Sequence, residues 1–174
     1  MTRFLIVVAV GTFMSGCASA RVESGSAAQA VLEDRNGLQV AAATFTESSA
    51  SVRIRLTASG LRPGAKGIHI HAVGKCEPPE FTSAGAHFNP IGKKHGLQNP
   101  EGAHAGDLPN LIVSDTGSAS FDVTAKAVTL QSGPPTSLFG PDGTSLVVHA
   151  QQDDEKTDPT GNSGGRVACG VITR

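Results

Sequence analysis

The sequence contains no tryptophan, no tyrosine and only seven phenylalanines among its 174 residues. Charged residues make up 17% of the chain, and the formal net charge is −1 at pH 7. Proteins that bind nucleic acids present basic surfaces to phosphates, and those that bind single strands add aromatic side chains on which bases stack. Because this chain has neither feature, we expect no nucleic-acid partner. Long helices held by alternating charged pairs are also not expected.

Glycine and proline are plentiful, with 21 and 10 residues, and 39% of the chain is hydrophobic. A chain of this length and apolar content suits one domain with a single core. Frequent glycine and proline between short apolar segments is typical of strands joined by turns. The composition therefore favours an all-β protein.

The N-terminus has the pattern of a bacterial secretory signal. Arg3 precedes an apolar run at positions 4–10, and small residues follow. The run is too short to span a membrane as a helix. The letters "MSGC" resemble a lipobox, which predicts that Cys17 is lipidated and becomes the mature N-terminus. The alternative is ordinary cleavage after Ala20, which would release a soluble product.

These features predict three parts of the chain. Residues 1–16 form the signal peptide, and residues 17–27 form a lipidated cysteine followed by a small, polar, flexible tether. Residues 28–174 form the folded domain. We therefore expect an exported protein of the cell envelope, either lipid-anchored at a membrane surface or periplasmic.

Strand patterns recur along the domain. Asn36 and Gly37 lie between two apolar runs, which is a strong hairpin signal. The segment 51–60 alternates strictly between apolar and polar residues, as a half-buried strand does. The segments with strand character are 30–47, 51–60, 67–71, 118–130, 144–152 and 166–172.

Two long segments, from about Lys75 to Ser114 and from Gln151 to Gly165, do not look like strands. Loops of this length are usually functional or disordered. The pattern predicts an all-β Greek-key sandwich or flattened barrel of about eight antiparallel strands with two long functional loops.

The six histidines lie at strand ends or in loops. His69 and His71 are two apart on an expected strand, so both rings point to one face while Ile68 and Ile70 point to the other. Imidazole suits copper and zinc, and a carboxylate can complete a zinc site. Further candidate ligands in the first long loop and at the end of a later strand are His87, His95, His104, Asp107 and His149.

Six motifs in order connect these residues to a known family. They are "GIHIHAVGKC", "GAHFNP", "KKHG", "HAGDLPNL", "GTSLVVHA" and "GNSGGRVACGVI", and they extend from Gly67 to Ile172. Together they resemble the copper/zinc superoxide dismutases of the bacterial exported kind. The resemblance implies an antioxidant oxidoreductase that converts superoxide to dioxygen and hydrogen peroxide. Its copper ion would cycle between two oxidation states and be bridged through a histidine to a zinc ion.

The resemblance also implies two ligand sets that share one histidine as a bridge. The copper ligands would be His69, His71, His87 and His149. The zinc ligands would be His87, His95, His104 and Asp107.

The resemblance assigns two further roles. Arg166 would guide the anionic substrate, whereas the alternative is a surface salt bridge with Asp153 or Glu155. Asp153 would contact a copper-binding and a zinc-binding histidine on the sides that face away from the metals. The alternative is that the neighbouring Asp154 takes this role.

With Cys17 assigned to lipidation, Cys76 and Cys169 are left, and two cysteines in an exported chain usually pair. They match the disulfide of the family. Such a bridge would close a loop of more than ninety residues, which the chain-entropy model values at about 4–5 kcal/mol. The alternative is two free buried thiols.

The sequence suggests two alternative functions that must be weighed against the enzyme. A non-catalytic copper/zinc-binding envelope lipoprotein would need the same ligands, but it would not need Arg166 beside an open copper position. A structural or adhesive sandwich domain would leave the ordered motifs unexplained. Relatives of the bacterial kind include monomers and dimers, so a homodimer is allowed.

Overall fold

The computed structural model describes residues 26–49 and 51–174. The predicted signal peptide, the lipidation site Cys17 and most of the predicted tether lie outside the described residues. The strands are β1 Ala27–Asp34, β2 Gln39–Ser48, β3 Ser51–Ala58, β4 Gly64–Lys66, β5 Ile68–His71, β6 Leu111–Val113, β7 Ala119–Ala125, β8 Ser145–His149 and β9 Arg166–Val171. Within the described residues, one short 3₁₀ turn spans Thr82–Ala84. None of the described residues forms a helix long and apolar enough to cross a membrane.

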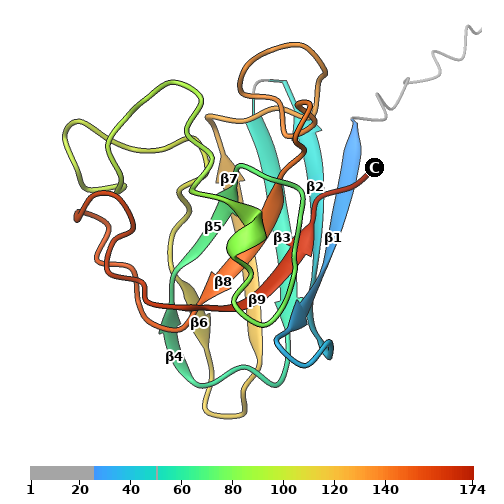
Figure 1. Ribbon diagram of the computed structural model, residues 1–174, viewed down its shortest axis with the longest axis vertical. Coiled ribbons are helices and arrows are strands. Elements are labelled where there is room, and N and C mark those ends of the chain that lie inside the picture. Colours follow the sequence, from blue (N-terminus) through green and yellow to red (C-terminus); the bar gives the residue numbers. More distant parts are fainter. Residues whose placement is uncertain (1–25, 50) are drawn as a thin grey trace, which may run out of the picture.

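Seven strands form one antiparallel sheet in the order β5-β8-β9-β1-β2-β3-β7, and β4 pairs with β6. In Figure 1 the large sheet curls around the core, with the short β4–β6 pair beside it. The all-β architecture with a curled sheet confirms the predicted fold class.

The central strands follow directly from the alternating pattern. Val52, Ile54 and Leu56 of β3 are at most 1% exposed and belong to the main core cluster. The residues between them face solvent, where Arg53 donates two hydrogen bonds to the carboxylate of Asp122 on β7, at 2.7 and 2.6 Å. One face of the sheet therefore makes the core, and the other carries paired charges.

The β1–β2 hairpin turns where Asn36 and Gly37 predict it. The carboxylate of Asp34 accepts hydrogen bonds from the backbone N–H groups of Asn36 and Leu38, at 2.8 and 3.0 Å. Gly37 has a φ of 78°, a conformation that glycine adopts without steric cost.

Two local expectations were wrong. The first long segment was expected to lack strands, yet it ends in β6, whose three residues are too few to reveal alternation. The strand expected over 118–130 ends at Ala125. Beyond it, the Glu47 carboxylate accepts hydrogen bonds from the Thr129 hydroxyl and the Leu130 N–H. A side chain thus satisfies the backbone of Leu130 in place of a strand ladder.

The free edge of β5 positions the first long loop. Ile70 donates to Gly106 O at 2.9 Å and accepts from Phe88 N at 2.8 Å. A side chain at Gly106 would collide with the carbonyl of Ile70, so the close approach requires glycine there. His87 and Asp107, the neighbours of Phe88 and Gly106, are thereby set beside β5. In Figure 1 the first loop and the second, red-orange loop lie next to each other on the left.

Candidate metal centre

Three strand-borne histidines face one side of the sheet. His69 and His71 on β5 are 0% and 1% exposed, while Ile68 and Ile70 enter the core from the opposite face. β5 pairs with β8, which ends at His149, and there β8 meets the start of β9. The period-two alternation of a strand therefore delivers buried imidazoles beside the first loop.

Four histidines converge in a first cluster. Each of His69, His71, His87 and His149 offers one ring nitrogen, and these atoms all lie within 4.8 Å of one another. The Nε2 atoms of His71 and His149 are 3.3 Å apart. Among the described residues, His69 Nδ1 and His87 Nε2 are buried without a hydrogen-bond partner. Unpaired buried nitrogens cost about 1–3 kcal/mol each, so their convergence fits a metal ion that would bind them.

The other ring nitrogens of this cluster contact protein acceptors. His71 Nδ1 donates to Gly85 O at 2.9 Å, and His149 Nδ1 donates to Gly164 O at 3.1 Å. A carbonyl oxygen can only accept, so each Nδ1 carries the proton and each Nε2 is left with a lone pair. Such partners fix the tautomer and ring orientation of metal-binding histidines.

A second cluster surrounds Asp107. Its Oδ1 lies 3.2 Å from His87 Nδ1, 3.0 Å from His95 Nδ1 and 3.4 Å from His104 Nδ1. Tetrahedral zinc with ligand bonds of about 2.0–2.1 Å separates its ligands by about 3.3 Å, so these spacings fit zinc. Asp107 Oδ2 accepts the N–H groups of Gly96 and His104, at 2.9 and 3.0 Å, which directs Oδ1 to the histidines.

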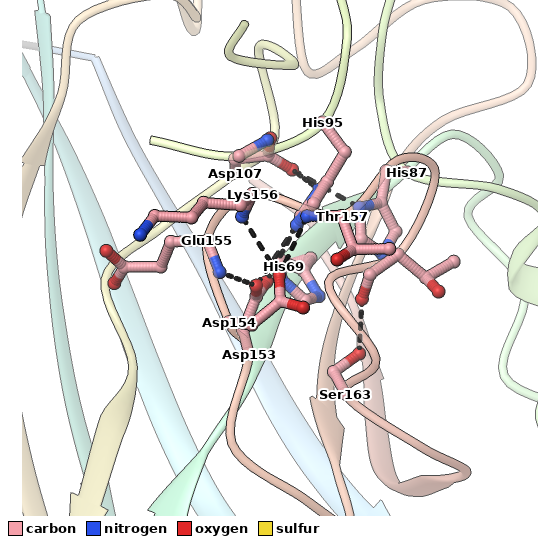
Figure 2. Close-up of polar contacts among 12 residues, drawn as sticks. His69, His87, His95, Asp107, Asp153, Asp154, Glu155, Lys156, Thr157 and Ser163 are labelled. Carbon is pink, nitrogen blue, oxygen red and sulfur yellow. Dashed lines mark hydrogen bonds and ion pairs between the residues drawn. The ribbon is translucent and has the colours of Figure 1, made fainter. Parts of the chain in front are cut away.

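Asp153 joins the two clusters from outside. Its carboxylate contacts His69 Nε2 at 2.5 Å through Oδ2 and His95 Nε2 at 3.1 Å through Oδ1, and Figure 2 draws the polar contacts of this group as dashed lines. Asp153 is 3% exposed. Asp154 instead accepts hydrogen bonds from the backbone of Lys156 and Thr157 within its own loop. The structure thus places Asp153, not Asp154, beside the histidines.

Sequence reasoning missed the residues that hold Asp153. The side chain of Asn110 donates to Asp153 O at 2.9 Å and accepts from Asp153 N at 2.8 Å. Glu155 N donates to Asp153 Oδ1 at 2.6 Å. Gly161 leaves the space in which the carboxylate lies. No sequence pattern marks Asn110 or Gly161, because neither belongs to a periodic segment. Asn110 comes shortly after an expected zinc carboxylate, and Gly161 lies in a glycine-rich loop.

Burial keeps three histidines of the first cluster, His69, His71 and His149, neutral near pH 7. It lowers the pKa of His69 to about 4, although the contact with Asp153 opposes the shift. Burial and the neighbouring His87 lower the pKa of His71 to about 2, and burial and His69 lower that of His149 to about 3. Neutral imidazole is the form that binds metals.

His95 of the second cluster has the opposite balance. Burial lowers the pKa of His95, but its contacts with Asp107 and Asp153 outweigh burial and raise the pKa to about 9. Burial would raise the pKa of both carboxyl groups, yet their histidine partners hold each pKa well below its usual range. The two anionic carboxylates therefore favour positive charge at this cluster, whether from a proton or from a metal ion.

A cavity of about 710 Å³ opens beside the clusters and is lined by His71, His87, His149 and Arg166 among others. The guanidinium of Arg166 donates to Phe81 O and Gly85 O, each at 2.5 Å. No ion pair joins Arg166 to Asp153 or Glu155 in the described part of the chain. Arg166 thus presents a fixed positive charge beside the first cluster.

A disulfide links Cys76 to Cys169. Cys169 is a buried residue of β9, three positions after Arg166, and Cys76 begins the segment that carries Phe81 and Gly85. The bridge therefore ties the guanidinium to the two carbonyls that hold it.

Comparisons with known proteins agree with this geometry. Residues 40–172 match the family model "Copper/zinc superoxide dismutase (SODC)". The chain is 50% identical to "Superoxide dismutase [Cu-Zn] 2" of Aquifex aeolicus over 146 residues, which cover 83% of this chain and 85% of that protein. It is 42% identical to a "Superoxide dismutase [Cu-Zn]" of Caulobacter vibrioides over 147 residues, with 83% and 84% covered. A crystal structure of a mutant SOD-like protein from Bacillus subtilis superposes with a TM-score of 0.81 at 40% identity, covering 84% of this chain and 97% of that one.

Proposed function

The chain belongs to the copper/zinc superoxide dismutase family, and on that premise we propose how its own residues divide the reaction. The enzyme converts two superoxide anions and two protons to dioxygen and hydrogen peroxide, with copper and zinc as its cofactors. Copper supplies the one-electron exchange, whereas zinc has no redox chemistry of its own.

Four histidines would hold copper: His69, His71, His87 and His149. The support is that the outer nitrogens of His69, His71 and His149 contact protein acceptors. Their inner nitrogens converge with His87 Nε2. The rings are preoriented, so little reorganisation accompanies metal binding.

His87, His95, His104 and Asp107 would hold zinc. The observation that carries the whole proposal is that His87 serves both clusters. Its Nδ1 lies 3.2 Å from Asp107 Oδ1, while its buried Nε2 belongs to the first cluster. A ring that bridges two metals must be deprotonated at both nitrogens. His87 also lines the cavity, so its Nε2, when no metal is bound to it, would be the atom that holds a proton and delivers it to the peroxide product.

Arg166 would attract and orient superoxide. Arg166 lines the same cavity as three of the copper histidines, His71, His87 and His149, and two carbonyls hold its guanidinium in place. A fixed cation in a cavity raises the local concentration of an anionic substrate and can orient it without rearrangement. A metal-storage protein would have no use for this charge, which favours the enzyme over the non-catalytic lipoprotein.

The first test is metal content of the purified protein, measured together with superoxide dismutation before and after copper loading. We expect one copper and one zinc per chain and activity that depends on copper. His87→Ala should lower occupancy of both metals, whereas Asn99→Ala, in the same loop but outside both clusters, should lower neither. Zinc alone, with no activity after copper loading, would instead support the storage protein.

We also infer that the protein is exported and lipid-anchored through Cys17. The support is the sequence alone: the short apolar run at positions 4–10 and the "MSGC" letters that follow it and end at Cys17. Mass spectrometry of the mature N-terminus should find a lipidated Cys17, and Cys17→Ser should move the protein from the membrane fraction to the soluble fraction. A mature chain that begins directly after Ala20 would contradict this inference.

A further inference from the structure

His104 belongs to the zinc cluster, and the family motifs assign no partner to its outer ring nitrogen, Nε2. Its Nδ1 faces Asp107, and its Nε2 faces the carboxylate of Asp158, with Oδ1 at 3.8 Å. We propose that Asp158 is a positioning residue of the zinc site, an outer carboxylate that orients both His104 and His95. The inference rests on the proposed zinc ligands.

One carboxylate serves two ligands. Besides facing His104, Asp158 Oδ1 accepts the backbone N–H of His95 at 2.7 Å. Its Oδ2 contacts Lys94 Nζ at 3.4 Å. Asp158 therefore fixes the backbone from which one zinc ligand projects and faces the ring of another.

Hydrogen bonds within the second loop help to set the position of Asp158. Thr157 N donates to Asp154 Oδ1 at 2.8 Å, and Gly161 N donates to Thr157 O at 2.7 Å. This turn holds the backbone immediately before Asp158, and Asn99 of the first loop adds a hydrogen bond to Lys156 O at 3.2 Å. Asp158 is thus placed before a metal binds, as preorganisation requires.

The carboxylate also selects a tautomer. At 3.8 Å the contact with His104 is electrostatic rather than a direct hydrogen bond. An anion facing Nε2 favours the proton on that nitrogen and leaves the Nδ1 lone pair directed to Asp107 and the zinc position. Outer partners of this kind typically change metal affinity by about 10–100-fold. Because the Asp158 side chain is 36% exposed, we place its effect at the lower end, about tenfold.

A purely structural role for Asp158 makes a different prediction. Asp158→Asn keeps the shape and an oxygen that can accept from His95 N–H, but it removes the charge that faces His104. Asp158→Ala removes both. Asp115→Asn is a matched control, because it removes the same charge from an exposed carboxylate in the turn between β6 and β7, outside both clusters.

The experiment uses the full chain with its disulfide intact, stripped of metal and titrated with zinc against a chromophoric chelator near neutral pH. Thermal unfolding of the metal-free and zinc-bound proteins is followed in parallel by far-ultraviolet circular dichroism. We expect Asp158→Asn to weaken zinc binding about tenfold, to leave the metal-free midpoint unchanged and to lower only the zinc-bound midpoint. Asp158→Ala should weaken zinc binding further, and Asp115→Asn should bind like the original protein.

The outcomes separate the two proposals. If the original protein binds zinc and Asp158→Asn binds it within twofold as tightly, the role of Asp158 is rejected while the zinc site stands. If Asp158→Asn lowers the metal-free midpoint as much as the zinc-bound one, the residue is structural and the inference also fails. If the original protein binds no zinc, the proposed zinc site itself is wrong. If Asp158→Ala does not fold, the zinc affinity and unfolding midpoints of Asp158→Asn decide the role of Asp158.

Discussion

Gly161 offers a sharp test of how the metal site is supported. It lies in the second loop with a φ of 61°, directly against the Asp153 carboxylate. A Cβ at this position would lie 2.5 Å from Asp153 Cγ and 2.6 Å from His95 Nε2. Gly161→Ala must therefore push Asp153 away from the two rings that it joins.

The magnitude has two parts. An L-residue in the left-handed region costs about 1–2 kcal/mol. Breaking a buried ion-paired network by displacing one partner costs about 3–5 kcal/mol. Gly92→Ala is the matched control, because Gly92 has a φ of 66° and nothing within 4 Å of its Cβ position. Both variants share the backbone cost, and the difference between them isolates the displacement of Asp153.

The assay is urea unfolding of the metal-free, disulfide-bonded protein. The chain has no tryptophan or tyrosine, so far-ultraviolet circular dichroism replaces intrinsic fluorescence. We expect Gly161→Ala to lose about 3–5 kcal/mol more than Gly92→Ala at an unchanged denaturant dependence. Equal losses in the two variants would refute the argument that Asp153 keeps its position because Gly161 has no side chain.

Three further changes test other parts of the site. Replacing Cys76 and Cys169 with serine opens a loop with a sequence separation of 93. The double variant should lose about 4–5 kcal/mol on urea unfolding, and a loss below about 1 kcal/mol would contradict this entropic account. Arg166→Lys keeps the charge but not the two-carbonyl fork, so kcat/KM for dismutation should fall about tenfold or more at unchanged metal content. An unchanged kcat/KM would show that charge alone suffices. Asp107→Asn should weaken zinc binding at least about tenfold by chelator competition while copper binding is retained, and equal loss of both metals would argue against separate sites.

Much of the fold could be predicted because its determinants are local. The alternation along β1, β2 and β3 reports which face is buried, and the Asn36–Gly37 pair reports the turn. β6 was missed because its three residues are paired with β4, which a local pattern cannot show. The end of β7 was misplaced because the Glu47 carboxylate, far away in sequence, satisfies the following backbone.

The types of the candidate ligands, their order and the pair of cysteines were readable from the sequence, because histidines two apart on a strand and ordered motifs are properties of the chain itself. Tertiary structure alone decided which ring nitrogen of each histidine faces a cluster. It also placed Asp153 rather than Asp154 between His69 and His95, and Arg166 against backbone carbonyls rather than a carboxylate. The physical reason is that these choices depend on contacts between two loops about sixty positions apart, such as Asp158 with His95. Hydrogen-bond direction and burial exist only once those loops have packed together.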